Sequence, residues 1–304
     1  MTEHGSRTGA TRDVPPPRPV SPAGTPAPVE ETPLGRAART VAEAVAGLVG
    51  TDSGSSVSDR SRAAGSGLRD VVGAVATAVG GAFASRRDGA EPPPSAEGPD
   101  AAGMPWSPGA LLSDLLAGAA PRLPIRDGER LRQAYPGASD AVIADALVAR
   151  AALLTSGIGA AAGGLTAVQW LAPASLLALP LQLGAETVLI AGVEVVLVGE
   201  LHELYGRPAT GDSRTRAAAY LASWSAQRAV DGAGTAGLGS LLSSAGMLAL
   251  RRQVTRKLGR MVPSAAPFLI GAAIAGRANR RATETLAARV LAGLRTARPV
   301  GPGS

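Results

Sequence analysis

The sequence predicts an all-α protein, a helical bundle that contains a glycine-rich apolar helical hairpin and follows a long disordered N-terminal region. After residue 106, apolar side chains recur every three to four residues, with no strand-like alternation. The stretch from Ala151 to Ala185 carries no charged residue, and half of it is built largely from alanine and glycine. Pro, Gly and Ser dominate the first third of the chain.

These compositional shifts predict three regions. Residues 1–105 read as a disordered linker, because segments of this kind bury too little apolar surface to offset their loss of conformational entropy. Residues 106–296 form the predicted α-helical domain, and residues 297–304 a disordered tail.

Two segments of the linker, Leu34 to Gly50 and Leu68 to Ser85, place valine and leucine at helical spacing. Each predicts a short amphipathic helix, and their similarity suggests a weak internal repeat. Helices of this length are marginal on their own. We therefore favour transient helices in a disordered tail, with docking helices as the alternative.

Local signals then place the helices of the domain in order. Pro108 suits the first turn of a helix that the proline-rich segment 121–124 ends. Ser139 and Asp140 cap the start of a second helix, which leads into the charge-free stretch. A strongly apolar helix follows from Leu176 to Leu204, begun or bent at Pro180.

The glycines of the charge-free stretch predict close helix packing, because small residues four apart let two helices approach each other. Gly159 and Gly163 form such a pair. The residues that we assign to close packing are Gly157, Gly159, Gly163 and Gly164.

Further helices are predicted from Arg214 to Val230 and from Thr283 to Leu294, with a short apolar segment from Pro263 to Gly276 before the last one. Between them, Met247 to Met261 predicts a basic amphipathic helix. From Leu248 onward the chain has 11 basic residues and 1 acidic residue, so the positive charge is concentrated there, while the chain as a whole has a net charge of +6.

This basic region is a candidate contact for anionic lipid. It borders an apolar segment and has few aromatic residues for base stacking, so a membrane surface suits it better than nucleic acid. An ordinary solvated helix face is the alternative. The candidate residues are Arg251, Arg252, Arg256, Lys257, Arg260, Arg277, Arg280 and Arg281.

Glu186, Glu194 and Glu200 fall on one broad face of their predicted helix and form a candidate buried carboxylate face. A buried carboxylate is costly unless it is paired. We favour pairing with Arg150, Arg228 or the basic helix over metal binding, because no Glu-x-x-His motif accompanies the three carboxylates. The chain has no cysteine and no recognisable catalytic motif, so we expect no catalytic site, metal or cofactor.

The glycine cluster at residues 157–164, the Leu179-Pro180 pair and the helix ending in Glu203-Leu204-Tyr205-Gly206 resemble the EcsC family of bacterial proteins. The later Val262-Pro263, Gly271, Gly276, Asn279 and Thr283 match that family's closing pattern. The resemblance covers roughly residues 140–294. It implies a helical, membrane-associated protein with no established reaction, encoded beside transporter components.

We therefore expect a non-catalytic, membrane-associated helical protein, with a role accessory to a transport or envelope system. Its partner would be an anionic membrane surface or a helical protein. Because the start of the chain shows no secretory signal, we expect a cytoplasmic location at the inner face of the membrane. The alternatives are a soluble helical interaction module or homo-oligomer, and an enzyme that uses the Glu186, Glu194 and Glu200 face.

Overall fold

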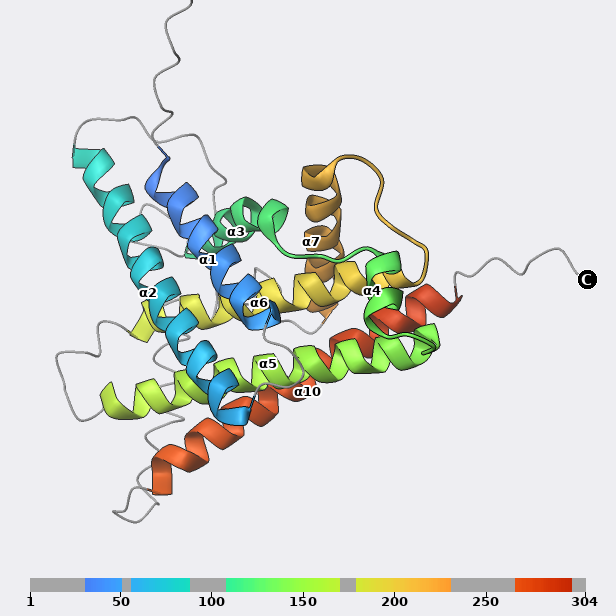
Figure 1. Ribbon diagram of the computed structural model, residues 1–304. Helices are drawn as coiled ribbons and strands as arrows, with labels where there is room; N and C mark the ends of the chain where they lie inside the picture. The colour runs from blue at the N-terminus through green and yellow to red at the C-terminus, as the bar shows by residue number, and fades with distance from the viewer. Residues whose placement is uncertain (1–30, 51–55, 88–107, 170–178, 231–265, 297–304) are drawn as a thin grey trace, which may run out of the picture. The chain divides into compact units, whose positions relative to one another are not determined.

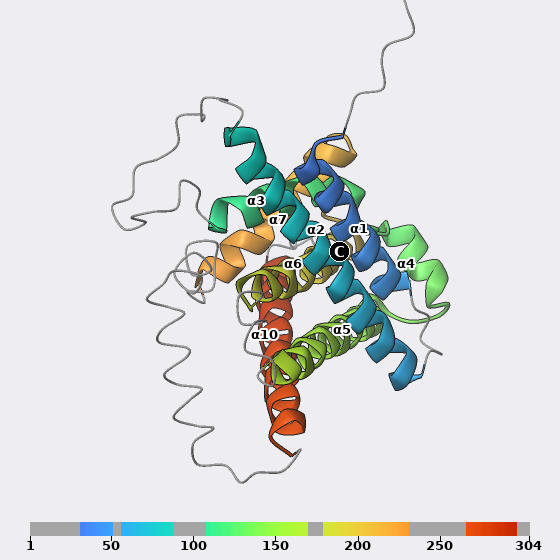
Figure 2. The same cartoon turned by 90° about the vertical axis from the view of Figure 1, so that its left-hand side faces the viewer.

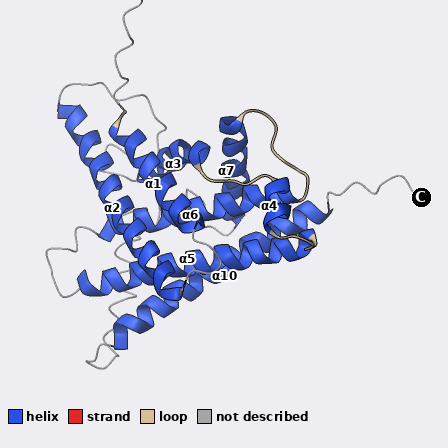
Figure 3. Cartoon of the chain, viewed as in Figure 1, coloured by secondary structure: helices blue, strands red, loops and turns tan. Residues whose placement is uncertain are grey.

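The structure is a computed structural model that describes residues 31–50, 56–87, 108–169, 179–230 and 266–296 (Figure 1). Within these ranges the chain forms eight α-helices and one 3-10 turn, and no strand (Figure 3). The all-α prediction is confirmed. Residues 1–31 and 32–304 are separate units, and every helix belongs to the second.

The helices follow one another with short or undescribed connections. Their bounds are α1 Pro33–Gly50, α2 Val57–Arg87, α3 Pro108–Ala119, the 3-10 turn η1 Ala120–Arg122, α4 Gly128–Ala134, α5 Asp140–Gln169, α6 Leu179–Leu204, α7 Ser213–Val230 and α10 Ala266–Thr296. Most of the predicted linker and all of the predicted tail (1–30, 51–55, 88–107 and 297–304) lie outside the described residues, as does the predicted basic helix at 247–261.

Helix α6 is the centre of the fold. It contacts α1, α2, α3, α4, α5, α7 and α10, and every residue from 191 to 200 is buried. Figure 1 shows α1 and α2 crossing α6, with α2 continuing to α5, while α5 and α10 lie together below α6; Figure 2 gives the perpendicular view. A helix that is apolar on all sides has to be covered on all sides, which explains this arrangement.

Helices α1 and α2 are part of this core, although the sequence favoured transient helices in a linker. Val41, Val45 and Leu48 of α1 and Leu68 and Val71 of α2 are almost completely buried. The helical domain therefore includes residues well before 106. Each helix would be marginal alone, but the two pack against each other and against α6.

Helices α5 and α10 form the most extensive pair in the described chain and run antiparallel to each other (Figures 1 and 2). Glycines make this close contact possible. A Cβ atom on Gly159 would lie 2.3 Å from the Asn279 amide nitrogen, and one on Gly276 would lie 2.9 Å from the Ser156 carbonyl oxygen. The glycine-rich helix thus has α10 as its main partner, in addition to α6.

Several helix ends follow the signals read from the sequence. Pro108 begins α3, and α5 begins at Asp140 with the Ser139 hydroxyl accepting a bond from the Val142 amide at 3.4 Å. Gly206, with φ of +68°, ends α6 in a left-handed turn, and the Arg207 amide donates to the His202 carbonyl at 2.8 Å.

The last helix differs from the prediction. The apolar segment and the final predicted helix join into one continuous helix, α10, which runs from Ala266 to Thr296. The polar residues between them do not break it, because Asn279 bonds to α6 while Arg277 and Arg280 lie on its exposed side.

Candidate functional site

Four glutamates project from the central helix into the interior of the bundle. Glu194 is 0% exposed, Glu200 3% and Glu203 8%, and Glu186 is intermediate. Burial of an ionised carboxylate is costly unless a cation or several donors compensate it. The partners of each glutamate therefore decide what this part of the structure can do.

Glu194 has the most complete set of partners. The Arg228 guanidinium of α7 donates to both of its oxygens, from Nε at 3.0 Å and from Nη2. The Trp224 indole donates at 2.8 Å, and the Thr283 hydroxyl of α10 donates at 2.8 Å. The Thr283 hydroxyl also shares a 2.9 Å hydrogen bond with the Thr155 hydroxyl of α5. One carboxylate thus joins α5, α6, α7 and α10.

Glu200 pairs with Arg126, which was not among the predicted partners. Arg126, in the segment between η1 and α4, donates from Nε at 2.6 Å and from Nη2 at 3.2 Å. The bond to Glu200 raises the pKa of Arg126. The geometry is the bidentate fork that arginine forms with carboxylates.

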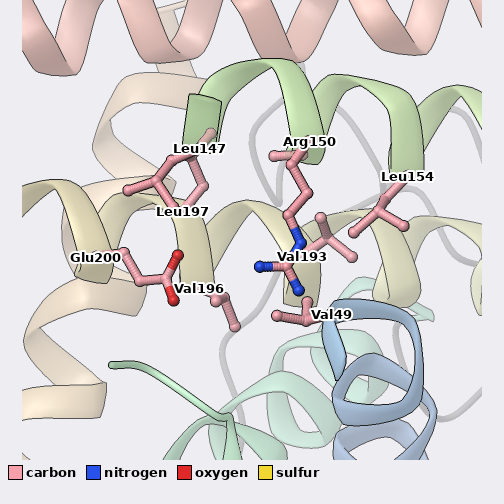
Figure 4. A pocket seen from close by; sticks show the side chains of 9 residues that line it. Val49, Leu147, Arg150, Leu154, Val193, Val196, Leu197 and Glu200 are labelled. Carbon is pink, nitrogen blue, oxygen red and sulfur yellow. The ribbon is translucent and has the colours of Figure 1, made fainter. Parts of the chain in front are cut away.

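A small crevice lies beside this pair, between α1, α5 and α6 (Figure 4). Its cavity of about 10 Å³ has room for about one water molecule. Arg150 of α5 extends into it across Val193 and Val196, and Glu200 lies farther along α6 (Figure 4). The crevice is too small for an organic ligand.

Glu203, which the sequence reading did not single out, anchors α7 at the end of α6. Arg216 forms an ion pair with it, and the Tyr220 hydroxyl donates to it at 2.7 Å. Burial, and secondarily the bond to Glu203, raises the pKa of Tyr220. The signal that could have revealed it was the spacing of Arg216 and Tyr220, one helical turn apart on the next helix.

Glu186 has a different environment. Its described partner is the neutral Asn279 side chain of α10, whose amide donates to Oε1 at 3.2 Å. Burial raises the pKa of Glu186 to about 7, and the bond from Asn279 opposes this only in part.

The three glutamates of the predicted carboxylate face therefore have different partners. Glu194 pairs with Arg228, one of the predicted partners, whereas Glu200 pairs with Arg126 and Glu186 with an amide. Among the described residues, no group of three His, Asp or Glu side chains is placed to share a metal ion.

The predicted packing glycines also differ in role. Gly159 is the position where any side chain would collide with α10. A Cβ on Gly157 would meet Ala64 of α2 at 3.8 Å, an ordinary contact distance. Gly163 and Gly164 lie in the last turns of α5. The sequence reading missed Gly192, where a Cβ would lie 2.6 Å from Val45 of α1.

One surface of the α5–α10 pair combines apolar and basic residues. Ile274 is 61% exposed, and Arg277, Arg280 and Arg281 are exposed beside it on α10. Arg280 pairs with Glu284 at 2.8 Å. The other predicted lipid contacts, Arg251, Arg252, Arg256, Lys257 and Arg260, lie outside the described residues.

Comparison of the chain with models of known protein families, with curated proteins and with solved structures finds no match in any of the three.

Proposed function

We propose that the protein acts by binding to an anionic membrane surface, and that it does so through the paired ends of α5 and α10. The contact surface, called here the α5–α10 tip, consists of the C-terminal part of α5 after Ser156 and the N-terminal part of α10 up to Arg281. Its location would be the inner face of the cell membrane, where anionic lipids attract basic residues.

The observation that carries this proposal is the pairing of two uncharged helix ends next to exposed arginines. α5 has no charged residue after Arg150, and α10 has none before Arg277. The contacts of Gly159 with Ala275 and of Gly276 with Ala160 bring these ends side by side. Ile274, Arg277 and Arg281 then share one face of α10 over about 10 Å.

The dimensions favour a shallow contact. The uncharged part of α10, Ala266–Gly276, is about 16 Å long, roughly half the thickness of a bilayer's hydrocarbon core. By length and composition alone, segments 140–163 of α5 and 181–204 of α6 are also candidates for spanning. In α6, however, 72% of the most apolar window is buried by other helices, as expected for the core helix of a bundle.

Three of the glutamates on α6 have partners that hold the bundle together. Glu194, Glu200 and Glu203 are each engaged by an arginine that belongs to another part of the fold. Their described bonds therefore serve to hold helices together, and the enzymatic alternative gains no support from them.

We also propose that the chain belongs to the EcsC family, which its sequence resembles. Four positions quoted for it, Gly159, Gly276, Asn279 and Thr283, meet at the contact between α5, α6 and α10. The small and polar residues at these positions have packing roles in this structure, and those shared contacts support the proposal.

Vesicle flotation tests the proposed function. The full chain is mixed with neutral phosphatidylcholine vesicles or with vesicles containing about 30% phosphatidylglycerol, at about 0.1 M salt. We expect flotation with the anionic vesicles only. Replacing Arg277, Arg280 and Arg281 by alanine should lower the bound fraction at least tenfold, because each cation contributes about 1 kcal/mol near such a surface.

A matched triple variant separates location from total charge. Alanine at Arg36, Arg69 and Arg214, which are exposed on α1, α2 and α7, removes the same charge elsewhere and should leave flotation unchanged. Equal loss in both triple variants, or no flotation of the wild-type chain, would overturn the proposal. If the protein instead forms an oligomer without detergent, as measured by light scattering, and binds neither type of vesicle, the soluble alternative is supported.

A further inference from the structure

The four glutamates of α6 differ in whether an arginine pairs with them. Arginines neutralise Glu194, Glu200 and Glu203, whereas Glu186 receives one 3.2 Å bond from a neutral amide. We infer that Glu186 is a proton-binding switch at the contact of α6 with α10, and that α10 is held more firmly against α6 when Glu186 is protonated.

Among the residues that the structure describes, none of opposite charge pairs with Glu186. Asn279, its partner, is neutral, and the neighbouring part of α5 around Gly159 carries no charge. Burial raises the pKa of Glu186 and the Asn279 amide lowers it, and no charged group of the described residues contributes. The described charged residues on the helices packed against α6 are Arg36, Arg39 and Glu43 on α1, Arg62, Arg69, Asp59 and Asp70 on α2, Asp114 on α3, Glu129, Arg130 and Arg132 on α4, Asp140, Asp145 and Arg150 on α5, Arg214, Arg216 and Arg228 on α7, and Arg277, Arg280, Arg281, Glu284, Arg289 and Arg295 on α10.

The tight packing around Asn279 limits how far small local movements can stabilise an ionised Glu186. The Asn279 amide fits between α5 and α6 only because residue 159 has no side chain. Movement of α10 away from α6 would bring more water to an ionised Glu186, and it would also loosen the contact of α10 with α5. Once protonated, the carboxyl can instead donate to the Asn279 side-chain oxygen, which requires no such movement.

The direction of the pH effect follows from this. Burial places the pKa of Glu186 in the folded chain at about 7, above the value of 4.5 for an exposed glutamate. The stabilisation is therefore complete below about pH 4.5 and is lost as the pH rises through about 7. Since α10 also carries the arginines of the α5–α10 tip, a consequence for membrane binding would rest on the proposed function.

The test needs no membrane, so its outcome is independent of flotation. Urea unfolding of the full chain is followed from about pH 5 to pH 8 for the wild type and for Glu186→Gln, which resembles the protonated acid. We expect the unfolding equilibrium constant of the wild type to rise at least tenfold more over this range than that of the variant. Glu284→Gln, which alters an exposed carboxylate on α10, is the control and should follow the wild type.

Carbon-13 NMR of glutamate side-chain carboxyls in the wild type provides a second measurement that depends on no variant. One carboxyl should titrate above pH 6, and Asn279→Ala should move its midpoint upward because the bond that favours the ionised form is gone. Parallel pH dependence of wild type and Glu186→Gln, or titration of every glutamate below about pH 5.5, would overturn the inference.

Discussion

The bond between Glu194 and Arg228 offers the sharpest test of how the bundle is held together. Arg228→Met keeps much of the side chain's apolar length but removes its charge and both of its bonds to Glu194. The carboxylate, which has no exposure to solvent, would keep only the bonds from Trp224 and Thr283. Breaking a buried ion pair from one side costs about 3–5 kcal/mol.

A second route sets a ceiling on this cost. The stranded carboxylate of Glu194 can escape its charge by taking up a proton, which for an ordinary glutamate at pH 7 costs roughly 4 kcal/mol. We therefore expect Arg228→Met to lower the free energy of unfolding by about 3–4 kcal/mol at pH 7.

Urea unfolding followed by far-ultraviolet circular dichroism measures this difference. The control, Arg214→Met, changes an exposed arginine on the same helix and should cost less than about 0.5 kcal/mol. The double variant Glu194→Gln with Arg228→Met removes the stranded charge but keeps an acceptor for Trp224, so it should recover at least half of the loss. A loss below about 1 kcal/mol for Arg228→Met, or no recovery in the double variant, would refute the reasoning.

Two further predictions concern glycines and use the same unfolding assay. Gly159→Ala should destabilise the chain by about 1–3 kcal/mol because its Cβ would collide with α10. Gly157→Ala, whose Cβ would meet Ala64 at the ordinary contact distance of 3.8 Å, should be neutral or stabilising by up to about 1 kcal/mol. Gly192→Ala should push Val45 of α1 away from α6 and expose α1 to limited proteolysis. Gly47→Ala on α1, where no atom lies within 4 Å of the added carbon, should leave digestion as in the wild type; equal digestion of both variants would contradict the docking of α1 on α6.

Local signals were sufficient for much of the helical order. The cap at Ser139, the proline at the start of α3 and the glycine at 206 each depend on backbone chemistry within a few residues, and the structure places helix ends there. The single helix α10 was not foreseen, because Asn279 and its neighbouring arginines read as a polar break. In the structure Asn279 lies within the helix and bonds to Glu186 of α6, which is 93 residues away in sequence.

The partners of the buried carboxylates were only partly predictable for a similar reason. Charge balance requires an arginine near Glu194 and Glu200, but the sequence offers several. Arg228 lies on a predicted helix and was among the candidates, whereas Arg126 lies between helices and was not. The docking of α1 was missed because it depends on a gap at Gly192, a tertiary feature without a local pattern.

The central position of α6 has a consequence for synthesis of the chain. Thr283, which bonds to Glu194, follows it by 89 residues, so the ribosome needs roughly 5–20 s after making this glutamate before the last partner exists. During that interval the most apolar helix of the bundle carries an acid whose final surroundings are incomplete. The nascent chain therefore passes through a long aggregation-prone stage, in which binding by a chaperone or early docking of α1 and α2 on α6 would have its greatest effect.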